Sequence, residues 1–434
     1  MLVLEALAAI GLLASAELLQ CSSLRRYEEL FVFELRKVKT MDVKLSERLA
    51  QLPPYLFADL RRKMAAARAK GVKVITLGIG DPDSPAPDMV VEELIRAVAD
   101  KTDLNRHRYG CDVPAEQFPA AVRSFYKRRW NVELTDDQII TTMGSKDAIA
   151  KLPLAIMDPG DIGIAPEPGY PTYNIGHVFA GGSTYYTPLK KENDFLIDFD
   201  SIPADIREKA KIIWMNYPNN PTTGTATLDF FAKAVEFGRA NNILIAHDSA
   251  YSENVYDGYT SPSIMQIKGA ADTAVEFFSL SKAFSMTGWR TGCVVGNVSA
   301  IKALLTVKEN IDNGTLRAIQ LAAAKALNSA EEVIPPVNEI YKRRRDLVVD
   351  ALNKAGWNLE KPKATIYIWA PVPEKYNTAE SPSGAFATEL LEKSGVVVTP
   401  GRGYGPAGEG FFRISLTYPD NILKEAMDRI IEMK

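Results

Sequence analysis

Lys282 stands among small and hydroxylated residues in the stretch SLSKAFSMTGWRTG (279–292), and Arg290 follows it eight positions later. A lysine acts as a nucleophile only when its amine is neutral, and burial or a neighbouring cation lowers its pKa toward that state. The stretch therefore offers a candidate reactive amine. The alternative is a surface lysine beside the end of a strand.

Other polar residues also close apolar runs. Asp248 ends the run ILIAHD, where a carboxylate is costly unless a cation or a protonated ring nitrogen pairs with it. Asn220 precedes a proline in NYPNNPTTG (216–224), so its amide either donates a hydrogen bond to a ligand or only shapes the turn. His247 is expected to be a packed strand residue and not a ligand.

Two segments have features of a site for a flat phosphorylated molecule. GSKDAIAKLPL (144–154) opens a predicted helix, whose free N–H groups beside a lysine suit a phosphate, although the Walker spacing is absent. PEPGYPTY (166–173) places Tyr170 on a loop bracketed by glycine and proline, where its ring can stack on a flat ligand. An ordinary helix cap and a tyrosine packed on its own domain are the alternatives.

Arg413 lies inside the apolar run FFRISLTY (411–418), and an inward arginine there requires a carboxylate from the protein or from a substrate. The glycine-rich segment before it precedes a strand, so it is not a dinucleotide-binding motif. A phosphate cradle, a stacking ring, an amide donor, a carboxylate, a lysine and an arginine match pyridoxal 5′-phosphate bound to the lysine, with an amino acid as substrate.

The elements that position these residues alternate between strands and helices. Continuous apolar runs indicate strands buried on both faces of a parallel sheet, as opposed to half-exposed strands. The predicted strands are 138–144, 161–168, 211–218, 242–249, 274–281 and 292–297, with helices between them such as 228–242. The pattern predicts an open α/β sheet, whose site lies beyond the carboxyl ends of its strands.

The predicted organisation has four parts. Residues 1–40 are read as a leader outside the fold, with a signal or anchor and an extra helix as alternatives. Residues 41–80 form an N-terminal arm that packs with the small domain, 81–330 a large cofactor-binding domain, and 331–434 a small C-terminal α+β domain. This last domain contains a predicted helix at 341–357 and strands at 364–372, 395–401 and 411–418.

Bulk composition sets limits on partners and compartment. With 434 residues, two domains are expected. A net charge of −3 gives no reason to expect nucleic acid or a membrane as partner. Three widely spaced cysteines argue against a disulfide framework or a metal site, and a cytoplasmic location fits them.

The motifs GIGDPD, NNPT, HDSAY and SLSKAFSMTGWRTG, in this order, resemble class I aminotransferases of the fold-type I pyridoxal-phosphate superfamily across residues 50–430. This resemblance implies a large domain with a mostly parallel seven-stranded sheet and a smaller α+β domain. Within the class, LPPYLFADLRRK, LGIGDPD and GPAGEGFFRISL are most similar to the LL-diaminopimelate branch.

The resemblance also implies residue roles. Lys282 matches the lysine that binds the cofactor covalently and moves the proton at the substrate Cα, and Asp248 the partner of the pyridine nitrogen. Tyr251 and Asn220 match donors to the ring oxygen, and Tyr170 the stacking residue. The remaining matches are the phosphate ligands Ser145, Lys146, Ser279, Ser281 and Arg290, the partner-subunit residues Tyr109 and Asn313 of a homodimer, and the substrate ligands Tyr55, Gly80, Asn220 and Arg413.

Two departures bear on function. NNPTTG has one threonine more than the usual turn, from which only a local loop change is expected. NRHRYGCDVPAEQ lacks a glutamate that holds the distal ammonium in plant-type diaminopimelate enzymes, although a second branch also lacks it. The expected activity is glutamate-dependent amination of tetrahydrodipicolinate to LL-2,6-diaminopimelate, for lysine and cell-wall synthesis. A broad aspartate or alanine aminotransferase, a carbon–sulfur β-lyase and a non-catalytic relic are the alternatives.

Overall fold

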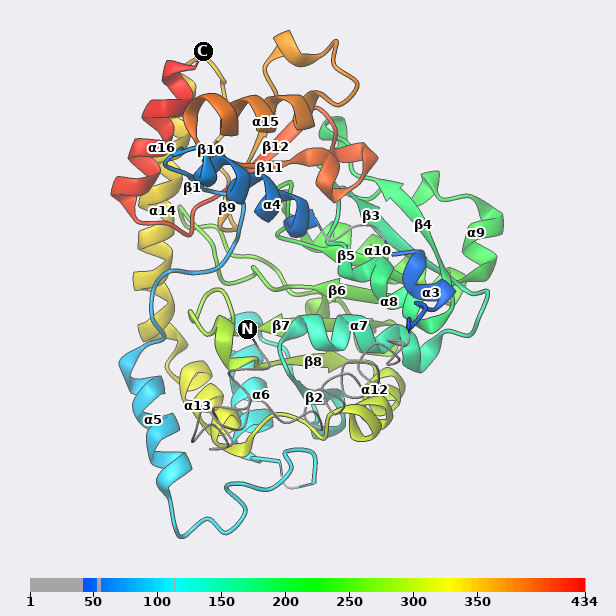
Figure 1. Cartoon of the computed structure of the whole chain (residues 1–434). Helices are drawn as coiled ribbons and strands as arrows, with labels where there is room; N and C mark the ends of the chain where they lie inside the picture. Colours follow the sequence, from blue (N-terminus) through cyan, green and yellow to red (C-terminus); the bar gives the residue numbers. More distant parts are fainter. Residues whose placement is uncertain (1–41, 53–55, 113, 434) are drawn as a thin grey trace, which may run out of the picture. The chain divides into compact units, whose positions relative to one another are not determined.

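The computed structural model describes residues 42–52, 56–112 and 114–433. The chain divides into two compact units, residues 1–50 and 51–434. The described part of the first unit contains one short helix, α3 (Glu47–Ala50). The leader predicted at 1–40 lies outside the described residues. All further elements belong to the second unit (Figure 1).

A seven-stranded sheet organises the larger part of the second unit, in the order β2-β8-β7-β6-β5-β3-β4. Strand β8 runs antiparallel to both neighbours, and every other neighbouring pair is parallel. The strands are β2 (Ile139–Thr142), β3 (Ile162–Glu167), β4 (Ser183–Pro188), β5 (Ala210–Asn216), β6 (Leu244–Asp248), β7 (Ala274–Ser279) and β8 (Gly292–Gly296). The predicted mostly parallel seven-stranded sheet is confirmed.

The central strands are mainly apolar because the side chains on their two faces supply two cores. In β5, Ile212 and Trp214 pack with one layer of helices, while Ile213 and Met215 pack with the other. One layer contains α7 (Ser145–Ile156), α8 (Thr172–Ala180) and α12 (Val298–Ile311). The other contains α5 (Asp88–Ala99), α6 (Gln117–Trp130), α10 (Leu228–Asn241) and α13 (Arg317–Asn328). Two short helices, α9 (Ala204–Lys209) and α11 (Ala270–Thr273), precede β5 and β7.

Strand β4 was not predicted from the sequence, and the cause is its position. It forms the edge of the sheet next to β3, and four of its six residues are polar or proline. An edge strand is covered less completely than a central one, so it lacks the continuous apolar run on which the other strands were recognised.

The smaller part is α+β. Its three-stranded antiparallel sheet has the order β11-β12-β9, and a parallel pair joins β1 to β10. The strands are β1 (Ile75–Thr76), β9 (Tyr367–Pro371), β10 (Val396–Val397), β11 (Thr399–Pro400) and β12 (Phe411–Ser415), and the helices are α4 (Leu56–Ala69), α15 (Pro382–Ser394) and α16 (Asp420–Glu432). The domain boundaries given above stay a prediction.

Helix α14 (Ala330–Lys354) runs from α13 to α16 (Figure 1) and is longer at its start than the predicted helix 341–357. Pro335 and Pro336 lie in its second turn. Each proline removes a backbone donor and disfavours a helix in isolation. The helix continues through them because Val333, Ile334 and Val337 are buried on either side.

Candidate active site

A cavity of about 340 Å³ lies at the edge of the large sheet where the parallel strands end. Because β8 runs in the opposite direction, Arg290, which precedes it, reaches the same edge. Of the described candidates, all except Tyr109 and Asn313 line the cavity: Gly80, Ser145, Lys146, Tyr170, Asn220, Asp248, Tyr251, Ser279, Ser281, Lys282, Arg290 and Arg413. Tyr55 lies outside the described residues.

Lys282 has the environment that a nucleophilic amine requires. Its Nζ donates a hydrogen bond of 2.6 Å to the carbonyl oxygen of Gly80. Burial lowers the pKa of this amine, and the charges of Arg413 and Arg290 lower it further, although Tyr367 and Asp81 oppose them. The neutral form is therefore more accessible than for an exposed lysine.

Asp248 is a buried carboxylate without a cationic partner among the described residues. Its Oδ2 accepts a hydrogen bond of 2.9 Å from the Tyr173 hydroxyl, and its backbone oxygen accepts one of 2.7 Å from the Asn216 amide. Burial raises the pKa of Asp248 to about 6, against the opposing Tyr173 hydrogen bond. A cationic group in the cavity would restore the ionised state of this carboxylate.

Arg413 is a buried cation, and its Nε–H has no hydrogen-bond partner among the described residues. Its two terminal nitrogens each donate a hydrogen bond of 2.7 Å, one to Oδ1 of Asn220 and one to the carbonyl oxygen of Gly78. The guanidinium lies over the Tyr367 ring at 4.0 Å and near the Tyr404 ring at 5.1 Å. The arrangement suits a carboxylate from a substrate.

One end of the cavity gathers donors for an anion. Ser145 and Lys146 begin helix α7, and Ser279, Ser281 and Arg290 lie beside them. Arg290 has a positive φ of 52° and donates hydrogen bonds to the carbonyl oxygens of Thr287 (3.0 Å) and Met143 (3.2 Å). Gly144 has a positive φ of 74°, which favours glycine, and a Cβ there would lie 2.8 Å from the Arg290 guanidinium. A helix start with hydroxyl, amine and guanidinium groups fits a phosphate.

The remaining cavity residues offer an aromatic ring and two neutral donors. Tyr170 packs edge-on against Tyr173 with ring centroids 5.8 Å apart. The Tyr251 hydroxyl lies 3.0 Å from the Tyr367 hydroxyl. Since Arg413 occupies Oδ1 of Asn220, the amide nitrogen of Asn220 remains to donate.

The additional threonine in NNPTTG is taken up locally. Thr223 adopts a positive φ of 65°, and its N–H donates a hydrogen bond of 3.0 Å to the carbonyl oxygen of Asn219. Asn220 still lines the cavity, so the change stays within the turn.

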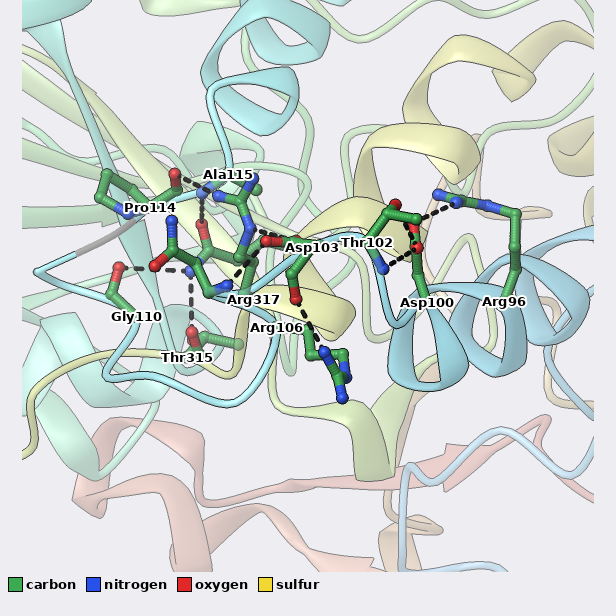
Figure 2. Close-up of polar contacts among 12 residues, drawn as sticks. Arg96, Asp100, Thr102, Asp103, Arg106, Gly110, Pro114, Ala115, Thr315 and Arg317 are labelled. Carbon is green, nitrogen blue, oxygen red and sulfur yellow. Dashed lines mark hydrogen bonds and ion pairs between the residues drawn. The ribbon is translucent and has the colours of Figure 1, made fainter.

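Tyr109 and Asn313 lie together on neighbouring loops away from the cavity lining. The N–H of Cys111 donates a hydrogen bond of 2.9 Å to the carbonyl oxygen of Asn313, and the Tyr109 side chain is exposed. Arg317, at the start of α13, donates hydrogen bonds to Asp103 at 2.8 Å and to the Pro114 carbonyl oxygen at 2.7 Å, on either side of Tyr109 in the same loop (Figure 2). The described chain alone gives neither residue a place in its own cavity.

Sequence reasoning missed several residues that line or support the cavity. Tyr367 and Tyr404 flank Arg413, Tyr173 bonds Asp248, and Asn216 and Asp81 lie at the cavity wall. Asn216 ends an apolar strand as Asp248 does, so the same signal pointed to it. Tyr367 lies within a strand and carried no local signal, because its neighbourhood depends on how β9 meets the large sheet.

The sequence profile of the family "Aminotransferase class I and II" matches residues 72–430. The chain belongs to this family. Among the aminotransferases that it resembles, proteins named LL-diaminopimelate aminotransferase from Moorella thermoacetica and Aquifex aeolicus are 46% and 47% identical. Their alignments cover 89% and 90% of this chain and 97% and 99% of those proteins. A substrate-bound BacF structure from Bacillus subtilis superposes with a TM-score of 0.84 at 34% identity, covering 91% of this chain and 98% of that one.

Aminotransferases of this family use pyridoxal 5′-phosphate, which is the cofactor of this chain, and the cavity fits it. One cavity contains an amine with a lowered pKa, a cluster of phosphate donors and a buried carboxylate that no cation of the described residues pairs with. None of the helices in the described part of the chain has the length and hydropathy needed to cross a membrane.

Proposed function

We propose that this aminotransferase transfers the amino group of glutamate to the keto form of tetrahydrodipicolinate, which gives LL-2,6-diaminopimelate and 2-oxoglutarate. This product serves lysine and cell-wall synthesis. One observation carries the choice of substrate: relatives at 45–47% identity over nearly the whole chain share the name LL-diaminopimelate aminotransferase. Small amino acids and keto acids are the substrates in either direction.

The proposed roles are those that the resemblance implies, and the lining of one cavity by the described residues among them supports these roles. Lys282 binds the cofactor, Asp248 pairs with the ring nitrogen, Tyr251 and Asn220 donate to the ring oxygen, and Tyr170 stacks on the ring. Ser145, Lys146, Ser279, Ser281 and Arg290 hold the phosphate. Arg413 binds the substrate α-carboxylate with the Gly80 amide and the Asn220 side chain beside it, and Tyr55 also contacts the substrate.

When bound, pyridoxal phosphate supplies an electron sink that stabilises negative charge at the substrate Cα. As its neutral amine, Lys282 would take the proton from the substrate Cα, and as its ammonium it would give this proton to C4′ of the cofactor. Burial lowers the pKa of this amine and so favours the neutral form that begins the transfer. Arg413 fixes the substrate carboxylate and thereby the direction of the Cα–H bond. Asp248 keeps the ring nitrogen protonated because a buried carboxylate gains most from a nearby cation.

A homodimer with shared active sites is part of the proposal. Tyr109 is 67% exposed although the resemblance gives it a phosphate to bind, and Asn313 lies on the adjoining loop. Both are therefore assigned to the cavity of a second copy of this chain. A cytoplasmic location completes the proposal, since the activity is biosynthetic and Cys111 and Cys293 are free thiols.

The test mixes the full-length enzyme with LL-diaminopimelate and 2-oxoglutarate and follows glutamate, beside aspartate and alanine as donors. Glutamate from diaminopimelate with little from the other donors is the expected result. Equal or faster turnover of aspartate would replace the proposed substrate by a broad range of amino acids. Ammonia and pyruvate released from a cysteine thioether without a keto acid would instead indicate a β-lyase. Lys282→Ala should abolish each activity.

A further inference from the structure

Tyr367 is buried on β9, the strand of the small sheet that pairs with β12. Its side chain reaches the cavity beside Lys282 and Arg413. Neither the motifs nor the roles assigned above include it. The position is notable because this one side chain touches the ring-oxygen donor on one side and the carboxylate-binding cation on the other.

The hydroxyl of Tyr367 is held in place by close contacts. It lies 3.0 Å from the Tyr251 hydroxyl, and both tyrosines are buried. A Cβ at Gly80 would lie 2.0 Å from the Tyr367 oxygen, so only glycine leaves room for it. The hydroxyl therefore packs directly on the residue whose carbonyl oxygen accepts the Lys282 hydrogen bond, and Gly80 limits its movement on that side.

The ring of Tyr367 packs under Arg413, with the guanidinium carbon 4.0 Å from the ring centroid. A cation over an aromatic face is attracted to the ring and fixes its orientation. It also draws electron density from the phenol, which makes the hydroxyl a stronger donor. When two tyrosine hydroxyls face each other, one donates the hydrogen bond and the other accepts it. The nearby Arg413 cation favours donation by Tyr367.

We propose that Tyr367 is a positioning residue that donates its proton to the Tyr251 oxygen and so directs the Tyr251 proton toward the cofactor ring oxygen. This role of Tyr367 rests on the proposed function, and Tyr367 acts on the cofactor only through Tyr251. A hydroxyl that accepts one hydrogen bond donates a stronger one. A stronger donation to the ring oxygen lowers the pKa of the lysine-bound cofactor nitrogen and keeps it reactive at neutral pH.

The test titrates the absorption spectrum of the enzyme loaded with pyridoxal phosphate, because the lysine-bound cofactor changes colour when its nitrogen gains a proton. Tyr367→Phe keeps the ring under Arg413 and removes only the hydroxyl. The apparent pKa should rise by about half to one unit, the size expected for one hydrogen bond. The KM for 2-oxoglutarate should stay near that of the parent because the Arg413 contacts remain.

Four further variants separate positioning from a general structural effect. Tyr251→Phe should raise the same pKa, and the double variant Tyr251→Phe/Tyr367→Phe should titrate like Tyr251→Phe alone. Tyr404→Phe is the matched control, because this ring also flanks Arg413 while its hydroxyl has no partner in the described structure. Gly80→Ala keeps both tyrosines but displaces the Tyr367 hydroxyl, so it should reproduce the shift if the phenylalanine variant folds poorly.

A parent-like titration of Tyr367→Phe, or additive shifts in the double variant, would overturn the positioning role and leave the proposed function intact. Absence of any pH-dependent cofactor band in the parent enzyme would overturn both. The two failures are therefore distinguishable in one series of spectra.

Discussion

Among the described residues, the hydrogen-bond partners of Asp248 are neutral: the Tyr173 hydroxyl, the Asn216 amide on β5 and the backbone N–H of Ala250. Because burial raises its pKa to about 6, the cofactor-free protein binds this proton more tightly than the unfolded chain does. Stability that comes from the proton is fully present below the ordinary carboxyl pKa of about 4 and is lost as pH rises through about 6.

Asp248→Asn should therefore stabilise the cofactor-free protein at pH above 6 by roughly 1 to 3 kcal/mol, because the amide needs no charge stabilisation. Denaturant unfolding of the parent and the variant measures this difference. The advantage of the variant should disappear at pH 4, where Asp248 is protonated in the parent. At the same time, transaminase activity should fall by orders of magnitude and pyridoxal phosphate should bind more weakly.

At the residue scale, predictability from the sequence depended on position relative to the strands. Asp248, Asn220 and Lys282 follow apolar runs, and the sequence alone marks the ends of such runs. Tyr367 and Tyr173 are unmarked, because their partners Tyr251 and Asp248 are distant in sequence and meet them only after folding. The roles assigned to all these residues remain predictions.

At the scale of elements, a buried ion cluster joins α7 to α12. Lys308, fully buried on α12, donates to Asp147 on α7 at 2.8 Å and to Asp312 at 3.1 Å, and Lys151 bridges the same two carboxylates. Asp147 also accepts from the N–H of Met143 at 3.2 Å, two residues before Ser145. Asp312 accepts from the N–H of Gly314, next to Asn313, at 2.6 Å. The cluster thus fixes both the start of α7 and the loop that carries Asn313.

Lys308→Met should destabilise the protein by about 3 kcal/mol or more, since it leaves one buried negative charge uncompensated. Chemical denaturation of the cofactor-free protein measures the loss. Lys308→Met/Asp312→Asn restores charge balance and keeps an acceptor for Gly314, so it should recover part of the stability. If the double variant is the weaker of the two, charge balance is not what the cluster provides.

Because the ion cluster fixes the start of α7, we also expect Lys308→Met to change the affinity for the cofactor. In Lys308→Met the affinity for pyridoxal phosphate should fall more than the affinity for pyridoxal, because only the phosphate end depends on α7. Equilibrium titration of the refolded protein with the two compounds gives the ratio. Equal losses for both would place the effect elsewhere in the cavity.

The elements themselves were predictable to different degrees. The strands between the two helix layers were recognised because they are apolar on both faces. Edge strand β4 and the first turns of α14 were not, since local composition contradicts the structure there and tertiary packing decides.

At the scale of the whole molecule, the proposed homodimer depends on the exposed Tyr109 and on Asn313, which lies on the adjoining loop. The loop that carries Tyr109 is fixed by Arg317, and Gln320 on the same helix donates to the Thr315 carbonyl oxygen at 2.7 Å and accepts from the Ala115 N–H at 3.0 Å (Figure 2). These contacts hold the loop segments on both sides of Tyr109, which supports the proposed shared site.

Mixing two inactive variants tests this arrangement. Lys282→Ala and Tyr109→Ala are each expected to lose most activity, but a mixed dimer regains one site with both original residues. After random exchange of subunits, roughly a quarter of the parent activity should return. No recovery, despite exchange shown by native mass spectrometry, would mean that Tyr109 serves the cavity of its own chain.

Arg413 makes the ligand-free protein less stable than the same protein with a carboxylate bound. Its charge is buried against two aromatic rings, with Nε unsatisfied in the described structure. The ligand-free folded state therefore carries a free-energy cost that a bound carboxylate removes. By linkage, a carboxylate ligand raises the free energy of unfolding and the melting temperature. A dicarboxylate at a hundred times its Kd should add about 2.7 kcal/mol to the unfolding free energy. The melting temperature should rise with 2-oxoglutarate concentration in the parent and stay constant in Arg413→Met, so that the supply of dicarboxylate sets the heat resistance of the enzyme.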